Sequence, residues 1–208
     1  MLTLSSFASK SRGLKQYAKD VLGEDSVYAN IDYKQGDIIS TNVLCAGGET
    51  IHLCLDTTIP RAYYSRNFTV RGTKGLCEES RKLLFIEGIM KEGPDIENNE
   101  DEMFKTYDHP LQQEYSALGE KEGHGGMDWL VARAFVEAVK NGTNTPIDVY
   151  DTALWLSIGP LSEASISKGG APVEIPDFTK GKWIAREPIV EGKYCLDKVC
   201  VDENVKIY

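Results

Sequence analysis

The spacing of the hydrophobic residues changes along the chain, and it first follows the period of a helix. Between Ser11 and Gly23 the apolar residues recur every three or four positions, which predicts an amphipathic helix. These residues are Leu14, Tyr17, Ala18, Val21 and Leu22. Ser11 is expected to cap the start of the helix and Gly23 to end it.

The following segments show the composition of β-strands. Two runs rich in strand-forming residues, 37–46 and 49–56, are separated by Gly47-Gly48, a strong signal for a hairpin. Glycines also punctuate three shorter strand candidates. These are residues 67–70, 75–79 and 83–86. We therefore predict a meandering antiparallel sheet.

The rest of the chain returns to helices. The acidic, polar stretch 91–122 contains two prolines and is expected to be a long excursion with at most one short helical turn. An apolar stripe predicts a helix that begins near Met127 and ends at Asn141-Gly142. The tail, 171–208, contains three prolines and is expected to be extended.

A further helix is predicted from Val149 to Lys168. Asp148 is a suitable cap and Asp151 lies in the favourable first turn. The pair Gly159-Pro160 is expected to kink or interrupt this helix, because proline lacks the backbone N–H that a helix interior requires.

Strands followed by helices predict the α+β class, with helices packed on one face of an antiparallel sheet. A length of 208 residues suits a single domain with a substantial core. We expect one domain over 1–208, with a core at about 3–180 and an extended C-terminal tail at 181–208.

Charge and composition narrow the range of partners. The formal net charge of −9 argues against a nucleic-acid-binding surface or a polybasic membrane patch. No apolar run approaches the ~20 residues that span a bilayer, so neither nucleic acid nor membrane insertion is expected. Residues 1–9 lack the pattern of a signal peptide. A signal could lie upstream, so the location, cytoplasmic or exported, is left open.

Motifs that carry chemistry by themselves are missing from the sequence. The five cysteines form no C-x-x-C pair and the three histidines have no ligand-like spacing, so free thiols and no metal are expected. There is no G-x-G-x-x-G, P-loop, G-x-S-x-G or H-E-x-x-H motif. The one dense glycine cluster near a helix start, 123–126, has the wrong spacing for a dinucleotide loop. Without further comparison, the residues indicate an α+β domain and no activity.

An ordered set of short stretches resembles glycoside hydrolase family 109, a branch of the glucose-fructose oxidoreductase/inositol dehydrogenase-like superfamily. The order and spacing of the stretches are similar to the second domain of that family over most of residues 3–180. No single motif is decisive; the ordered set carries the resemblance. The stretches are Ala8–Leu14, Gly48–Ile51, Asp56–Arg61, Gly72–Gly75, His124–Asp128, Asp148–Asp151, Pro160–Glu163 and Pro176–Phe178.

The resemblance implies a two-domain parent protein. An amino-terminal Rossmann domain would hold NAD. This chain, from which that domain is absent, would be the carboxy-terminal domain, which is built on a large, predominantly antiparallel sheet. The implied activity is removal of terminal α-linked N-acetylgalactosamine, by transient oxidation at C3 of the sugar, elimination of the glycosidic oxygen, addition of water and return of the hydride. The fragment alone is expected to bind no NAD and to be inactive.

The resemblance points to a loop after the predicted hairpin. Arg61 and Tyr63 could bind sugar hydroxyls or an amide, and Tyr64 could assist proton transfer. The alternative is aromatic packing at the sheet edge, with Arg61 in a salt bridge. The family pattern is R-P-Y-S-R, whereas this chain has Arg-Ala-Tyr-Tyr-Ser-Arg at 61–66. Tyr64 is the preferred match because it keeps the spacing to Gly72.

His124 and Asp128 form the second candidate group. His124 is flanked by glycines that leave room for a ligand, and imidazole can donate, accept or transfer a proton near neutral pH. The alternative to a functional role is that His124 is a residue at the start of a helix, in a turn whose backbone is shaped by the glycines. Asp128 is a candidate for substrate binding, but a carboxylate in the first turn also stabilises a helix.

Three functions remain in competition at this point. The first is the sugar-binding domain of an NAD-dependent glycosidase. The second is the equivalent domain of a sugar dehydrogenase. The third is a non-catalytic module that forms homodimers through its sheet, as the sheets of this superfamily commonly do.

Overall fold

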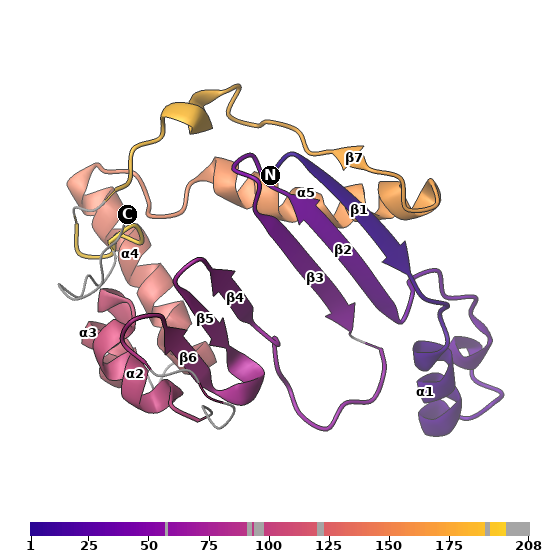
Figure 1. The fold of residues 1–208 in the computed structure, drawn as a ribbon. Helices are drawn as coiled ribbons and strands as arrows, with labels where there is room; N and C mark the ends of the chain where they lie inside the picture. The colour runs from indigo at the N-terminus through magenta and orange to yellow at the C-terminus, as the bar shows by residue number, and fades with distance from the viewer. Residues whose placement is uncertain (57, 91–92, 94–97, 120–122, 190–191, 199–208) are drawn as a thin grey trace. The chain divides into compact units, whose positions relative to one another are not determined.

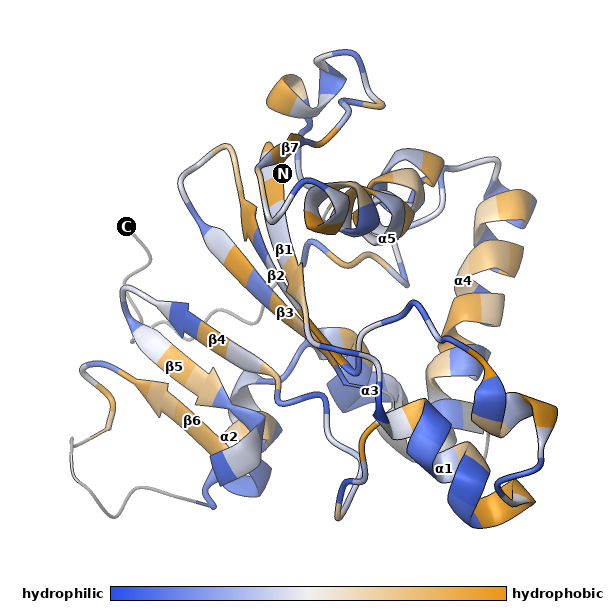
Figure 2. Ribbon diagram, turned by 90° about the vertical axis from the view of Figure 1, so that its right-hand side faces the viewer, coloured by the Kyte–Doolittle hydropathy of each residue, from blue (hydrophilic) through white to orange (hydrophobic). Residues whose placement is uncertain are grey.

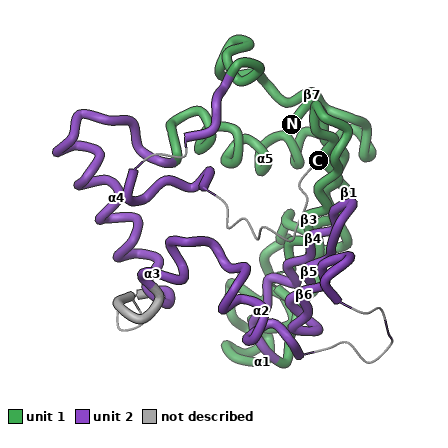
Figure 3. Tube along the Cα trace, turned by 60° about the vertical axis from the view of Figure 1, so that its left-hand side comes forward, with its two compact units in different colours: residues 1–62, 147–185 green, residues 63–146, 186–208 purple. Residues whose placement is uncertain are grey.

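A computed structural model describes residues 1–56, 58–90, 93, 98–119, 123–189 and 192–198, and these fall into two compact units (Figure 3). The first unit contains residues 1–62 and 147–185, and the second contains residues 63–146 and 186–208. Each unit has its own antiparallel sheet and its own helices. The two units are therefore described separately.

The first unit is built on a four-stranded antiparallel sheet in the order β3-β2-β1-β7 (Figure 1). Leu4 pairs with Val43, and Val43 pairs with Ile51 in the next strand. The strands are β1 (Thr3–Ala8), β2 (Ile38–Leu44), β3 (Thr50–Asp56) and β7 (Val173–Glu174). The predicted hairpin is confirmed, and Gly48 at its turn has a φ of 93°, which glycine adopts without strain.

Helix α5 (Val149–Ser167) packs on one face of this sheet. The core beneath it contains Leu4, Val43 and Ile175, against which α5 places Leu154, Ile158 and Leu161. Small hydroxyl residues form a second, polar layer. The backbone N–H of Ser6 donates to Ser165 Oγ at 2.9 Å, and this hydrogen bond offsets the cost of burying both groups.

The ends of α5 agree with the sequence prediction, but its middle does not. Asp148 and Asp151 form a reciprocal capping box at the start, as the sequence indicates. The helix nevertheless continues through Pro160, so an interruption at Gly159-Pro160 is wrong, while the kink that was expected as the other outcome stays a prediction. Proline removes a single ladder hydrogen bond, and apolar residues on both sides of it hold the helix against the sheet.

Helix α1 (Gly13–Leu22) and the short 3-10 helix η1 (Val27–Asn30) lie beyond the end of β1. Gly23 ends α1 as predicted, and its N–H donates to the Lys19 carbonyl. The expected cap by Ser11 is wrong. The carboxylate of Asp37 accepts instead from the backbone N–H groups of Arg12 and Gly13, at 2.8 and 2.9 Å.

Asp37 joins three segments that are distant in sequence. It is buried, and it also accepts a 2.9 Å hydrogen bond from the hydroxyl of Thr58, just after β3. Burial raises the pKa of Asp37, but the hydrogen bonds from Arg12, Gly13 and Thr58 outweigh burial and hold this pKa below its usual value. Gly13 packs so closely against the Thr58 carbonyl that no Cβ would fit.

The second unit has a three-stranded antiparallel sheet in the order β4-β5-β6. Its strands are β4 (Thr69–Gly72), β5 (Gly75–Glu78) and β6 (Leu83–Ile86), followed by α2 (Glu100–Tyr107), α3 (Pro110–Gly119) and α4 (Met127–Asn141). The second unit also contains two 3-10 helices, η2 (Glu79–Arg81) and η3 (Gly123–Gly126). A further 3-10 helix, η4 (Lys182–Ala185), belongs to the first unit. The meander is antiparallel as predicted, although the strands divide between two sheets.

Helices α2 and α3 correct the prediction of a largely irregular excursion over 91–122. Three acidic residues in the first turn favour α2 at its start. Asn99 anchors that start, because its side-chain amide accepts from the Leu84 N–H and donates to the Leu84 carbonyl, both at 2.9 Å. Pro110 occupies the first position of α3, where proline is well tolerated.

The α+β class with antiparallel strands and packed helices is confirmed. The single-domain division, with a core to residue 180, stays a prediction. Cys45, Cys54 and Cys77 are free thiols, as expected. Cys195 is buried, and Cys200 lies outside the described residues. Burial raises the pKa of Cys77.

We predict that Asp37→Asn lowers the thermal unfolding midpoint by several degrees, because an amide cannot accept equivalently from all three donors. The pKa of Asp37 is lower in the folded protein than its ordinary value. The ionised carboxylate therefore stabilises the fold at pH values above the unfolded-state pKa of about 3.9, and this stabilisation is lost as the pH falls through the folded-state pKa. The difference in midpoint between wild type and variant should therefore shrink in acid. Calorimetry between pH 2 and 7 measures it, and a pH-independent difference contradicts the account.

Candidate functional site

The loop after β3 carries the first candidate residue, Arg61. Its guanidinium donates a hydrogen bond to the backbone carbonyl of Asp56, the last residue of β3. Asp56 Oδ1 is buried and has no hydrogen-bond partner among the described residues. Arg61 is therefore held at the end of β3, beside a carboxylate oxygen that can still accept a hydrogen bond.

Tyr63 and Tyr64 follow at the start of the second unit and are both highly exposed, at 70% and 76%. Arg66 Nε donates to the phenol oxygen of Tyr64 at 3.4 Å. This hydrogen bond raises the pKa of Arg66. Tyr64 thus has a cationic neighbour at its oxygen, and its match to the family tyrosine stays a prediction. Its role stays a prediction.

The turn that carries His124 has an unusual backbone. His124 lies in the left-handed region, with φ 54° and ψ 42°, a conformation that costs a residue with a side chain ~1–2 kcal/mol. Gly125 and Gly126 continue the turn at φ 67° and 92°, which glycine adopts freely. Gly125 and Gly126 thus shape the turn, as the alternative interpretation of His124 expects, while a functional role of His124 stays a prediction.

The same turn brings His124 to Asp128. Asp128 lies in the first turn of α4, four residues further on, and its Oδ2 is 2.9 Å from His124 Nδ1. Both side chains are exposed, at 75% and 60%. When Nδ1 donates to the carboxylate, Nε2 becomes the nitrogen that meets a ligand. Asp128 therefore orients the imidazole in addition to its place at the helix start.

The predicted site residues fall into three small groups. His124 and Asp128 form a pair, Tyr64 is paired with Arg66, and Arg61 is bound to the end of β3. Arg61 belongs to the first unit and the others to the second. The roles of these residues in catalysis or substrate binding stay predictions.

The described residues do not fit a complete NAD site. A dinucleotide loop needs a strand, a glycine turn and a helix in a parallel unit. The glycine turn at 123–126 follows helix α3, and all the strand pairs of both described sheets are antiparallel. Within the described ranges there is also no group of three or more His, Cys, Asp or Glu that could hold a metal ion.

Two features of the structure escaped the sequence analysis. The convergence of Arg12, Gly13 and Thr58 on Asp37 depends on chain segments that only the fold brings together. The second unit also holds a cavity of about 330 Å³ between α4, the 143–146 loop and residues 192–197. None of the candidate residues lines it, and no sequence signal marks it.

None of the helices in the described part of the chain combines the length and the hydrophobicity needed to cross a bilayer.

Comparison with known proteins shows a consistent set of relatives. The profile of the family described as "Glycosyl hydrolase 109, C-terminal domain" matches residues 1–185. The alpha-N-acetylgalactosaminidase of Tannerella forsythia is 41% identical over 187 residues, which are 90% of this chain and 39% of that protein. The glycosyl hydrolase family 109 protein of Parabacteroides distasonis is 40% identical over 187 residues, 90% of this chain and 40% of that protein.

A more distant relative gives the same result. Glycosyl hydrolase family 109 protein 2 of Akkermansia muciniphila is 36% identical over 191 residues, 89% of this chain and 40% of that protein. The chain thus spans about two-fifths of the length of these curated relatives.

The backbone of His124 generates a prediction about stability. We expect His124→Gly to leave the free energy of unfolding unchanged or to raise it by up to ~1 kcal/mol, because glycine removes the left-handed strain. The matched control is Glu137→Gly in the interior of α4, which should lose ~1 kcal/mol. Urea denaturation measures both. An equal loss in the two variants would show that His124 is not strained.

Proposed function

The chain belongs to the glycosyl hydrolase 109 family, as its C-terminal domain, and on that basis we propose that it forms the sugar-binding part of a glycosidase that releases terminal α-linked N-acetylgalactosamine. The name of the Tannerella forsythia relative supports this specificity. Since the chain covers two-fifths of that relative, the complete activity requires protein outside residues 1–208.

One observation carries the proposal, namely the pair of His124 and Asp128 on a strained turn. Left-handed residues with side chains cluster at functional sites, where the surrounding structure compensates for their cost. His124 makes its side-chain hydrogen bond to Asp128 and remains three-quarters exposed. A histidine held in one orientation but open to solvent is suited to proton transfer with a bound ligand.

Each candidate residue then has a defined task. His124 Nε2 would hold or move a proton at the sugar, and Asp128 would fix the orientation of the ring through Nδ1. Arg61 would donate hydrogen bonds to sugar oxygens or to the acetamido carbonyl. Tyr64, next to Arg66, would act as a second hydrogen-bonding or proton-transfer group.

NAD enters this proposal through the family resemblance alone. When bound, it would accept and return a hydride at the sugar ring. Because the described residues do not fit a dinucleotide site, the cofactor would be held by protein outside this chain. A sugar dehydrogenase is the related alternative, since it would use the same sugar-binding residues.

We expect His124→Ala to lower the turnover of an aryl α-N-acetylgalactosaminide by at least ~10²-fold, the range of a lost general acid or base. The assay uses residues 1–208 joined to the amino-terminal part of the Tannerella forsythia enzyme. Asp128→Asn should reduce turnover less, because the imidazole stays in place but loses its orienting carboxylate.

The control is His52→Ala, which removes an exposed histidine of β3 and should leave turnover unchanged. Accumulation of reduced NAD and a keto sugar, without release of the aryl group, would identify a dehydrogenase. Activity that survives His124→Ala would remove His124 from the mechanism and leave the specificity open.

A second candidate function, homodimerisation through the sheet, is favoured by the face of the four-stranded sheet opposite α5. Because neighbouring side chains alternate between faces, this face carries the residues that do not belong to the Leu4 and Val43 layer. Two rows cross it in register. They are Thr3, Leu44 and Thr50, and Ser5, Asn42 and His52. Neutral rows of this kind suit an isologous contact between two copies.

Sedimentation equilibrium of the 208-residue chain tests this second function. We expect a dimer that Asn42→Arg converts to a monomer, because a two-fold axis would bring the new charges together. Lys140→Arg on α4 is the control and should remain dimeric. A wild-type chain that is monomeric at every concentration would exclude dimerisation by this domain alone.

A further inference from the structure

Helix α1 leaves most of its apolar face exposed. Its apolar stripe has the spacing of a helix that packs against protein, but Ala18 is the one residue of α1 that is buried. Tyr17, Val21 and Leu22 are 61%, 57% and 54% exposed. Figure 2 shows that apolar and polar residues alternate along the ribbon of α1.

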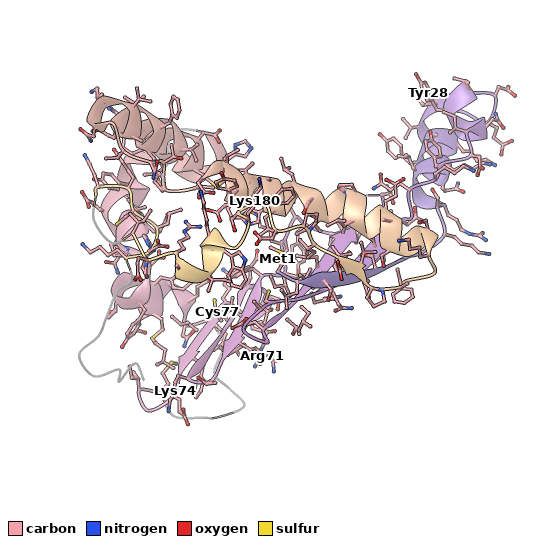
Figure 4. All side chains as sticks on the ribbon, turned by 90° about the horizontal axis from the view of Figure 1, so that it is seen from above. Met1, Tyr28, Arg71, Lys74, Cys77 and Lys180 are labelled. Carbon is pink, nitrogen blue, oxygen red and sulfur yellow. The ribbon has the colours of Figure 1, made fainter. Side chains whose placement is uncertain are left out.

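The neighbouring 3-10 helix extends this surface and does not cover it. Ala29 of η1 is fully buried, whereas Val27 and Tyr28 are 69% and 56% exposed. Figure 4 places Tyr28 on this segment, away from the four-stranded sheet. We call Tyr17, Val21, Leu22, Val27 and Tyr28 the α1–η1 patch. A cluster of large apolar side chains on a soluble surface marks an interaction site.

Local hydrogen bonds hold the patch in shape. Ser26 caps η1 by accepting from the Tyr28 N–H. The Asn30 amide donates to the carbonyls of Glu24 and Ser26, at 3.1 and 3.0 Å. The hydroxyl of Tyr33 donates to the Tyr28 carbonyl at 3.0 Å. The exposed side chains are therefore attached to an ordered backbone.

The start of α1 is also fixed to the body of the first unit. Asp37 accepts from Arg12 and Gly13, and Gly13 packs against the Thr58 carbonyl without space for a side chain. A surface held at its base in this way loses little conformational freedom when a partner binds.

We propose that the α1–η1 patch is the docking surface for the amino-terminal portion of a family 109 protein. About three-fifths of each curated relative lies outside the match, and the matching profile is that of a C-terminal domain, so the additional protein precedes the matched segment. This inference rests on family membership and does not depend on the proposed catalytic roles.

Distance along the chain is compatible with this partner. A preceding segment would join at Met1, next to β1, and α1 lies past the other end of that strand (Figure 1). Six residues of strand span ~20 Å. A globular domain of several hundred residues has a radius of gyration near ~20 Å. Such a domain can therefore reach the patch from the point where it joins.

Hydroxyl-radical footprinting tests the proposal without any activity assay. The 208-residue chain is compared with the same chain joined to the amino-terminal part of the Tannerella forsythia relative. We expect oxidation of Tyr17 and Tyr28 to fall at least about fivefold in the joined protein. Unchanged oxidation of both tyrosines would overturn the proposal.

Variants of the two parts, co-expressed as separate chains, provide the second measurement. Val21→Asp with Val27→Asp should lower recovery of the complex at least tenfold. The control is Val139→Asp, at an equally exposed valine of α4, which should have no effect. Equal recovery of patch and control variants contradicts the proposal. So does protection of Tyr17 and Tyr28 in the 208-residue chain alone that disappears on dilution, because the occupant would then be a second copy.

Discussion

The carboxylate of Asp37 is the contact on which the arrangement of the first unit depends. It satisfies the backbone donors at the start of α1 and the hydroxyl of Thr58 after β3, while its own residue precedes β2. A buried carboxylate without these donors would be costly, so the three segments are required to meet. The sheet, the α1–η1 patch and the loop that leads to Arg61 are thereby fixed to one another.

The second unit contains the turn on which the proposed sugar chemistry depends. His124 adopts a backbone conformation that glycine would adopt more easily, and the gain from its side chain is a hydrogen bond to Asp128. Left-handed residues with side chains recur at functional sites, and this geometry is the basis of the proposed role of His124 in proton transfer. Family membership and the backbone of His124 are independent observations, and both support a role in sugar chemistry.

The sequence predicted those features that arise from local patterns. The hairpin around Gly47-Gly48, helix α4 and the cap at Asp148 depend on neighbouring residues, and all three were predicted correctly. Helices α2 and α3 were missed because prolines and acidic residues are also typical of loops. At α2 the anchor is a contact between Asn99 and Leu84 in β6, which no local pattern reveals.

The same distinction applies to the candidate site. The glycine-flanked His124 and the nearby Asp128 were singled out separately from the sequence, but their pairing depends on the left-handed backbone at 124–126, which residue spacing does not reveal. The start of α1 is capped by Asp37 and not by Ser11. Because Asp37 is far from α1 in sequence, this contact could be seen only in the fold. The fold was also needed to show that Arg61 is bound to the carbonyl of Asp56 at the end of β3, and that the Oδ1 atom of Asp56 has no hydrogen-bond partner among the described residues.

The most direct test is a crystal structure of the joined protein with N-acetylgalactosamine and NAD bound. The account predicts that His124 Nε2 lies within hydrogen-bonding distance of the sugar while Nδ1 remains bound to Asp128. A sugar bound away from the turn at 123–126, with His124 open to solvent, would contradict the central claim that this pair acts on the substrate.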